Sequence, residues 1–268
     1  MKKELITVYT HDGIFHADEV ITIALLDYTY TIDDVIRTRD KNVLKHAMNN
    51  PKAFVIDVGE DYNPDMRNFD HHQDLQVDAT NVLVLMYLEN ESFISNELFN
   101  ALTPMFLAIS AWDKNAHDVH SRFENSIWKD SSNISILIAE FNRDPKSNYV
   151  AFQNAAYFAA RILHNRINSI EMEFKAEETY NNRKALNSAV VIFDAYCGIW
   201  KNKESNYEYA IMPNPQGYAL ISRDSEKFPI QGIKNVEGLI FIHKSKFIAI
   251  FQGLEGAKEA GQIVSGVK

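Results

Sequence analysis

Blocks of apolar residues, separated by polar or turn-forming residues, make up the first 58 positions of the chain. "AFVIDV" is apolar almost throughout, as buried parallel strands are, and "VITIALLDYTY" is apolar nearly all round, which predicts a buried helix. The order strand, helix, strand, helix, strand predicts a parallel α/β sheet. The predicted segments are strands over 4–10, 33–38 and 53–58 and helices over 20–30 and 41–50, with a loop over 11–19.

The rest of the sequence separates into a helical part and a β-rich part. Helical segments are predicted within 81–143, with an interruption at Pro104, and a long helix is predicted over 149–186. From residue 189 short β-type runs recur at regular spacing, and a helix over 255–264 closes the chain. We therefore predict a parallel-sheet α/β domain over 1–144, a helical linker over 145–188 and a smaller α+β domain over 189–268.

Composition and charge narrow the class of protein. Hydrophobic residues make up 46% of the chain, enough for a well-filled core, and the net charge is −9. This acidic balance argues against a protein that grips duplex nucleic acid through phosphate contacts alone. The single cysteine, Cys197, excludes an intrachain disulfide and fits a reducing compartment. With neither a signal-peptide pattern nor an apolar run of membrane-spanning length, we expect a cytoplasmic protein without a membrane partner.

Histidine and aspartate side chains follow the ends of several predicted elements. Because the carboxyl ends of parallel strands converge on one crevice, these groups can meet there. Carboxylates and imidazoles without cysteine suit Mn²⁺ or Mg²⁺, with Zn²⁺ and Fe²⁺ as alternatives. The candidate ligands are His11, His16 and Asp18 after the first strand, Asp57 at the end of the third, Asp70, His71 and His72 in the loop beyond it, and Asp113 at the end of a helix.

The chemical prediction depends on Asp57. Its carboxylate lies among apolar residues, where burial is costly unless the group is paired or metal-bound. A carboxylate between two groups of histidines is well placed to bridge two metal ions, and two-metal centres hydrolyse phosphoesters and phosphoanhydrides. A purely structural role is the alternative for any one of these pairs, and it is the favoured interpretation for His117 and His120 in "AHDVH".

Three motifs together resemble the MYG family (melanocyte proliferating gene proteins) of the DHH phosphoesterase superfamily. They are "THDGIFHADE" (10–19), "VIDVGEDYNPDMRNFDHHQ" (55–73) and "AWDKN" (111–115), and the stretch 228–261 resembles the end of that family. The resemblance implies a DHH-type catalytic domain with a helical extension, followed by a smaller substrate-binding domain across a cleft. It also implies two divalent metal ions, with Mn²⁺ as the expected ion and Mg²⁺ as the alternative.

Carried over by motif, the resemblance implies a role for each candidate residue. One ion would be held by His11, His16 and Asp57. The other would be held by Asp18, Asp57, His71 and Asp113, with Asp57 as the bridge. His72 would face the substrate phosphate, and Asp70 would orient the two histidines. Expected phosphate contacts in the C-terminal domain are Arg223, His243 and Lys244 or Lys246.

The resemblance implies 3′→5′ exonuclease activity on single-stranded RNA or short oligonucleotides. One departure concerns the substrate: Ala249 and Ile250 stand where the family has a Gly-Gly pair, and their side chains would block close backbone approach to a phosphate. Hydrolysis of a small molecule such as pyrophosphate or a nucleotide therefore stays open, as does non-catalytic binding of nucleic acid or a metabolite. The oligomeric state is also open, with a homodimer as one alternative.

Overall fold

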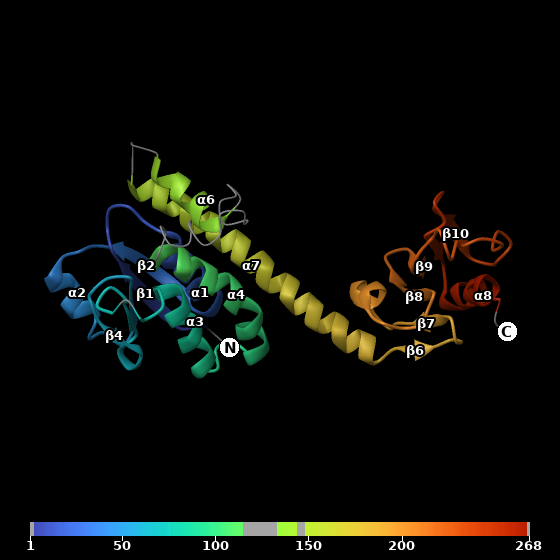
Figure 1. The fold of residues 1–268 in the computed structure, drawn as a ribbon, viewed down its shortest axis with the longest axis horizontal. Helices are drawn as coiled ribbons and strands as arrows, with labels where there is room; N and C mark the ends of the chain where they lie inside the picture. Colours follow the sequence, from blue (N-terminus) through green and yellow to red (C-terminus); the bar gives the residue numbers. More distant parts are fainter. Residues whose placement is uncertain (1–2, 75, 115–132, 144–147, 267–268) are drawn as a thin grey trace. The chain divides into compact units, whose positions relative to one another are not determined.

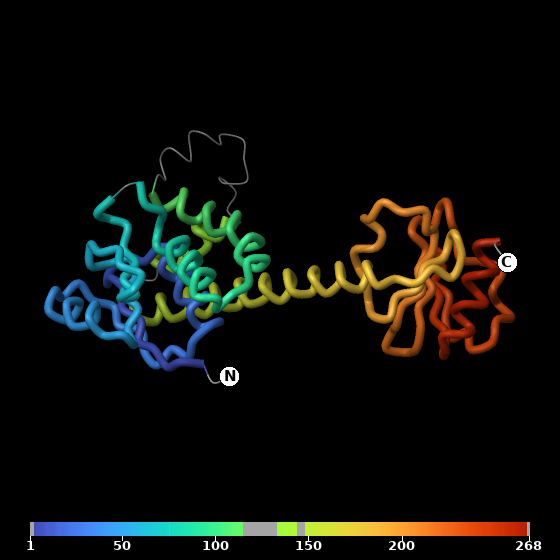
Figure 2. The backbone as a smooth tube through the Cα atoms, turned by 90° about the horizontal axis from the view of Figure 1, so that it is seen from below, coloured from blue at the N-terminus to red at the C-terminus, as the bar shows by residue number. Residues whose placement is uncertain are grey.

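The chain folds into two compact units, Met1–Ile170 and Glu171–Lys268, each built on one β-sheet (Figure 1). The structure, a computed structural model, describes residues 3–74, 76–114, 133–143 and 148–266, so His117 and His120 lie outside it. The expected mixed α/β class is confirmed, with helices and a sheet in both units. The long helix α7 (Asn148–Asn181) passes from the first unit into the second without a break (Figure 2). Among the described residues, no helix has the length and apolar character of a membrane span.

The sheet of the first unit is mainly parallel and has the order β2-β1-β3-β5-β4. β1 lies between β2 and β3 and runs parallel to both, as the sequence pattern predicts. β5 extends the parallel part beside β3, and β4 pairs with β5 in the antiparallel direction at the edge. The strands are β1 (Leu5–Thr10), β2 (Thr31–Arg37), β3 (Ala53–Ile56), β4 (Tyr62–Asn63) and β5 (Asn68–Phe69).

Both faces of this sheet are covered, which explains why β3 is apolar without alternation. Phe54 and Ile56 belong to a large core shared with the helices α1, α3, α4, α6 and α7. Ala53 and Val55 belong to a second cluster with Leu44 of α2. The helices and helical turns of this unit are α1 (Ala17–Thr29), α2 (Lys41–Ala47), η1 (Pro64–Met66), α3 (Thr80–Asn90), α4 (Asn96–Lys114), α6 (Ile134–Glu140) and η3 (Phe141–Arg143).

The predicted interruption at Pro104 is wrong, because α4 continues through it. Pro104 is exposed, so the carbonyl group that loses its helical partner lies toward water. On either side of it Leu102 and Phe106 are fully buried in the core. Their burial contributes about 2 kcal/mol each or more, which offsets the roughly 3 kcal/mol that proline costs inside a helix.

The second unit is a six-stranded sheet with the order β10-β11-β9-β8-β7-β6. The helix α8 (Leu254–Ser265) packs across β7, β8, β9 and β11 (Figure 2). The predicted strand runs and the closing helix are found there, whereas β6 lies in a segment that the sequence pattern assigns to the long helix. The remaining elements are β6 (Lys184–Ala185), β7 (Val190–Ile192), η4 (Gly198–Asn202), β8 (Tyr209–Asn214), β9 (Gly217–Ser222), β10 (Leu239–Ile242) and β11 (Ile248–Phe251).

Candidate metal centre

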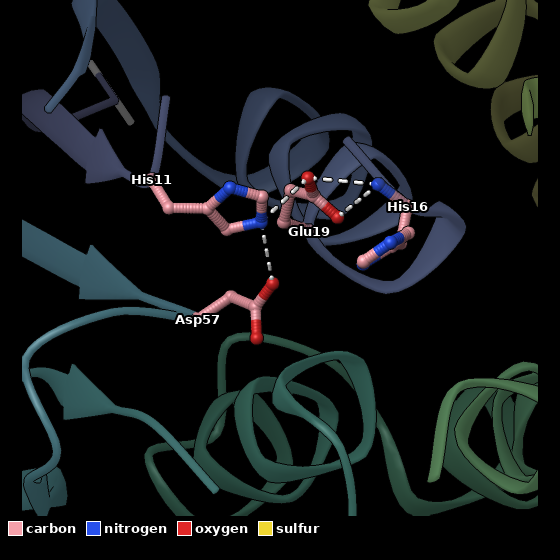
Figure 3. A group of neighbouring side chains, drawn as sticks. All are labelled: His11, His16, Glu19 and Asp57. Atoms are coloured by element: carbon pink, nitrogen blue, oxygen red, sulfur yellow. Dashed lines mark hydrogen bonds and ion pairs between the residues drawn. The ribbon is translucent and has the colours of Figure 1, made fainter. Parts of the chain in front are cut away.

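His11 and Asp57 meet at the carboxyl ends of two neighbouring parallel strands. β1 and β3 are paired directly, so the residues that follow them lie at the same sheet edge. His11 Nε2 lies 3.1 Å from Oδ2 of Asp57 and 3.2 Å from Oε1 of Glu19 (Figure 3). All three residues are buried, so these contacts are screened only weakly by water.

The backbone of Asp57 adopts a conformation that is rare for a residue with a side chain. Its φ angle is 55°, in the left-handed region. Its N–H group donates to the carbonyl oxygen of Phe69 and to Oγ1 of Thr80, both at 3.0 Å. The Thr80 hydroxyl in turn donates to the Phe69 carbonyl at 2.6 Å. Such a conformation costs about 1–3 kcal/mol and persists where the surroundings enforce it, most often at functional sites.

The helix α1 starts earlier than the sequence pattern predicts, and this brings two acidic residues into the centre. His16 is its N-cap residue, and its N–H group donates to both oxygens of Glu19 at 2.9 Å. Asp18 and Glu19 therefore lie in the first helical turn rather than in a loop. Glu19 is the site residue that sequence reasoning missed. The signal for it is the spacing of an N-cap and a glutamate three residues later, which is typical of a capping box.

Asp70 binds both adjacent histidines, whose rings stack with their centroids 4.5 Å apart. Its Oδ1 accepts the N–H group of His71 at 2.8 Å and Nδ1 of His72 at 2.6 Å, and its Oδ2 accepts the N–H group of Glu60 at 2.7 Å. Burial by itself raises the pKa of Asp70, but these hydrogen bonds outweigh it and hold that pKa below its ordinary value. The same bond from Asp70 raises the pKa of His72. The His72 side chain is 58% exposed, whereas that of His71 is 6% exposed.

His71 contacts two carboxylates of the site. Its Nε2 lies 3.2 Å from Oδ2 of Asp113, at the end of α4, and its Nδ1 lies 3.5 Å from Oδ1 of Asp57. Nδ1 of His16 lies 3.6 Å from the other oxygen of Asp113. Asp113 therefore joins the part of the site built by α1 to the part built by the loop after β5.

The six predicted metal ligands and the two other predicted catalytic residues gather in one place. Within three sets of side chains, the potential ligand atoms lie within 4.8 Å of one another. Asp57 belongs to two of these sets, which is the arrangement expected of a bridging carboxylate. The sets are His11, His16, Glu19 and Asp57; Asp57, Asp70, His71 and His72; and His16, Asp18 and Asp113.

Burial and mutual repulsion disfavour the charged form of the carboxylates in this cluster. Burial, followed by the charges of Asp57 and Asp113, raises the pKa of Asp18 well above its ordinary value. Burial also raises the pKa of Asp57, against the opposing effect of its hydrogen bond with His11. Burial lowers the pKa of His11, but its bonds to Asp57 and Glu19 outweigh this and raise that pKa to about 10. A positive charge in the cluster would relieve the repulsion between these carboxylates.

Several buried polar atoms in the cluster have no hydrogen-bond partner in the described part of the chain. They are both carboxylate oxygens of Asp18, Oδ1 of Asp57 and Nδ1 of His71. An uncompensated buried carboxylate is costly, and such groups are normally paired or bound to a metal. Carboxylate oxygens and imidazole nitrogens are ligands suited to Mn²⁺ and Mg²⁺. The residues present therefore fit a divalent cation.

Arg223, a predicted phosphate contact, uses its guanidinium within the second unit. Its Nε donates to the carbonyl oxygen of Tyr207 at 2.8 Å. Its two terminal nitrogens donate to the carbonyl oxygens of Lys201, Lys203 and Trp200 and to Oγ of Ser205. A guanidinium has five N–H donors, and all five are engaged here. In this conformation Arg223 braces the segment 200–207 and has no donor left for a phosphate, so the predicted contact is not supported.

The other residues predicted to bind substrate lie on or near β10 and β11. Lys244 is exposed, and the Nδ1 atom of His243 is 2.6 Å from Oγ of Ser245. Lys246 contacts Oε1 of Gln231 at 3.1 Å. The residues at the family's Gly-Gly positions, Ala249 and Ile250, are buried in β11. β11 is paired with β10 on one side and β9 on the other, so the backbone at these two positions is not open to a phosphate.

Comparison with known proteins gives matches of low identity over nearly the whole chain and matches of higher identity over shorter segments. Residues 7–82 match the family model MYG1_exonuc, described as an uncharacterised protein family (UPF0160). A MYG1 protein of Dictyostelium discoideum is 24% identical over 94% of both chains. A protein of Mus musculus named MYG1 exonuclease is 41% identical over 66 residues, which are 24% of this chain and 16% of that protein.

Among solved structures, a pGpG-specific phosphodiesterase, PggH from Vibrio cholerae, aligns over 97% of this chain and 98% of its own. The identity is 14% and the TM-score 0.38. At that score the alignment carries no argument about the function of this chain.

Proposed function

We propose that the chain is a member of the MYG1/UPF0160 family and a metal-dependent phosphodiester hydrolase, which its match over residues 7–82 and its similarity to curated MYG1 proteins support. We further propose that it is of the DHH type and works as a 3′→5′ exonuclease on single-stranded RNA or short oligonucleotides. The relatives named MYG1 exonuclease support the nuclease activity.

The observation that carries the proposal is the position of Asp57 between two sets of ligand atoms. His11 and His16 would share one divalent ion with Asp57. Asp18, His71 and Asp113 would share a second ion with it, and Mn²⁺ is the expected metal. The unpartnered oxygens of Asp18 and Asp57 support this assignment, because a cation would supply the compensation that the protein itself does not. When bound, such ions supply Lewis acidity to a phosphate and to an attacking water.

The protein's own contribution to the reaction lies mainly in Asp70 and His72. Asp70 binds Nδ1 of His72, so the exposed side of the ring presents Nε2 to a substrate. The raised pKa of His72 keeps a larger fraction of the ring protonated at neutral pH. A protonated His72 would donate a hydrogen bond to a phosphate oxygen of the substrate. The carboxylate of Glu19 orients His11 and caps α1, which keeps the first set of ligands in place.

A second candidate is hydrolysis of a small molecule such as pyrophosphate or a nucleotide. It is favoured by the closed strand at Ala249 and Ile250 and by the occupied donors of Arg223, which leave the second unit fewer of the expected contacts with a polymer.

The test compares substrates with purified protein in Mn²⁺. The probes are single-stranded RNA labelled at its 5′ end, pyrophosphate and bis(p-nitrophenyl) phosphate. We expect stepwise shortening of the RNA with release of mononucleotides. Asp57→Asn should abolish this release while keeping the backbone, because asparagine tolerates a left-handed φ. Hydrolysis of pyrophosphate or a nucleotide without hydrolysis of RNA would support the second candidate, and no hydrolysis of any probe would contradict both.

A further inference from the structure

A pocket of about 650 Å³ opens beside the candidate metal centre in the first unit. Its wall includes Asp57, Asp70 and His72, so it is continuous with the centre. The other walls come from α2 and from the segment between β3 and β5. The volume lies in the range of small-molecule sites, which is about 300–1,000 Å³. None of the roles assigned above to the metal centre uses this space.

One wall of the pocket is apolar and adaptable. It is formed by Leu44 and Met48 of the α2 region and by Met66. Gly59 stands opposite with a φ angle of 108°, and a side chain on it would meet Sδ of Met48 at 3.4 Å. This distance is an ordinary van der Waals contact, so it is the positive φ angle that favours glycine here. Methionine side chains adapt their shape and make favourable contacts with flat aromatic groups.

Three basic side chains, Arg39, Lys41 and Lys45, line the pocket together with four carboxylates, those of Asp57, Glu60, Asp61 and Asp70. Lys41 and Lys45 both line it and are exposed. They are four residues apart on α2 and so lie on the same helical face. Neither forms an ion pair with a carboxylate of the described residues. Arg39 joins them at the rim, although it is paired with Asp12 at 3.3 Å. These lysines are suited to an anionic group at the mouth.

The segment between β3 and β5 offers hydrogen-bond acceptors to the pocket. Asp61 lines the pocket and is partly exposed. One of its carboxylate oxygens, Oδ2, accepts the Nδ2 group of Asn68 at 3.0 Å. A carboxylate has further acceptor sites, and an amino group on the edge of a flat base would supply a donor for them.

We propose that this pocket binds the base and ribose of the nucleotide that adjoins the phosphate at the metal centre. The base lies against Met48 and Met66, its amino edge faces Asp61, and Lys41 and Lys45 contact a further phosphate of the strand. The proposal rests on the function proposed above and makes it more specific: the substrate is a nucleotide or oligonucleotide with an amino-bearing base, such as adenine.

The first experiment measures binding without catalysis. 5′-AMP and inorganic phosphate are each titrated into the metal-free protein by calorimetry. We expect 5′-AMP to bind with saturation and at least tenfold more tightly than phosphate. Lys41→Glu/Lys45→Glu should weaken 5′-AMP binding at least tenfold. Lys52→Glu is the matched control, because Lys52 is an exposed lysine of the same unit that does not line the pocket, and it should leave binding unchanged. Equal affinity for 5′-AMP and phosphate, or equal binding by the double variant and the wild type, would overturn the proposal.

The second experiment compares two substrates in Mn²⁺. The ratio of kcat/KM for ApA to kcat/KM for bis(p-nitrophenyl) phosphate should fall at least tenfold in the double variant and stay constant in the control. An unchanged ratio in the double variant would also overturn the proposal. If the wild type hydrolyses neither compound, the proposed function fails, whereas the titration with 5′-AMP still decides whether the pocket binds a nucleotide.

Discussion

Replacing Asp18 with asparagine should stabilise the metal-free protein while weakening its response to metal. Asp18 is fully buried, and neither of its oxygens has a hydrogen-bond partner in the described part of the chain. Asparagine has nearly the same shape, removes the negative charge and adds an N–H donor that Asp57 or Asp113 can accept. The substitution should therefore change two quantities in opposite directions. The metal-free protein becomes more stable without the carboxylate, whereas metal binding becomes weaker.

The size of the effect follows from the burial of an uncompensated group. Leaving a buried polar group unsatisfied costs about 1–3 kcal/mol, and more for a charged one, so we expect a gain of about 2 kcal/mol at neutral pH. For a unit of this size that corresponds to a rise in Tm of about 4–8 °C. Saturation with Mn²⁺ at a hundred times its Kd should stabilise the wild type by about 2.7 kcal/mol, and a tenfold loss of affinity would halve that gain.

The pH dependence of the stability gain from Asp18→Asn provides a check on its sign. The folded protein raises the pKa of Asp18 above its ordinary value of 3.8. Below that value both states are protonated, so ionisation costs the fold nothing. As the pH rises above it, the unfolded state ionises first, and the cost grows until the folded state ionises as well. The advantage of Asp18→Asn should accordingly vanish near pH 4 and increase toward pH 7.

The assay is thermal unfolding in EDTA and in Mn²⁺, followed by circular dichroism across pH 4–8. Asp33→Asn is the matched control, since Asp33 is an exposed aspartate of β2 in the same unit, and it should leave both curves unchanged. A lower Tm for Asp18→Asn in EDTA at pH 7, or a Mn²⁺ shift equal to that of the wild type, would refute the reasoning.

Two other substitutions test the parts of the account that involve Asp70 and Arg223. Asp70→Ala removes the acceptor that orients His71 and His72, so kcat should fall about 10–100-fold, and Mn²⁺ affinity measured by calorimetry should weaken as well; unchanged values of both would contradict the positioning role. Arg223→Lys loses the planar fork that reaches four carbonyl oxygens and a hydroxyl. It should destabilise the second unit by about 3 kcal/mol in urea unfolding, with kcat for RNA unchanged; a loss of RNA affinity at unchanged stability would instead restore the predicted phosphate contact.

The cluster of candidate metal ligands could be predicted from sequence because it depends on the most regular part of the fold. The continuous apolar pattern of 53–56 identifies a buried parallel strand, and parallel strands end at one sheet edge. His11 and Asp57 follow two paired strands, so their proximity can be predicted without any information on side-chain contacts. The two adjacent histidines after Asp70 form a motif that the sequence shows directly. Only the structure reveals that His71 is buried and His72 exposed.

The features that sequence reasoning missed depend on contacts between distant segments. β4 and β5 are two residues long each, too short for a periodic pattern, and they exist because β3 offers β5 a pairing edge. The early start of α1 results from Glu19 reaching back to the N–H group of His16. The hydrogen bonds of the Arg223 guanidinium depend on carbonyl groups of the segment 200–207, which turn toward it only in the folded unit.

The most direct test of the account is the number and position of metal ions at Asp57. Crystals grown with MnCl₂ should give two anomalous difference peaks in the first unit, with one oxygen of Asp57 near each. His11 should contact one ion and His71 the other. A single peak away from Asp57, or Asp18 and Asp113 free of metal, would contradict the shared-carboxylate centre on which the proposed hydrolysis depends.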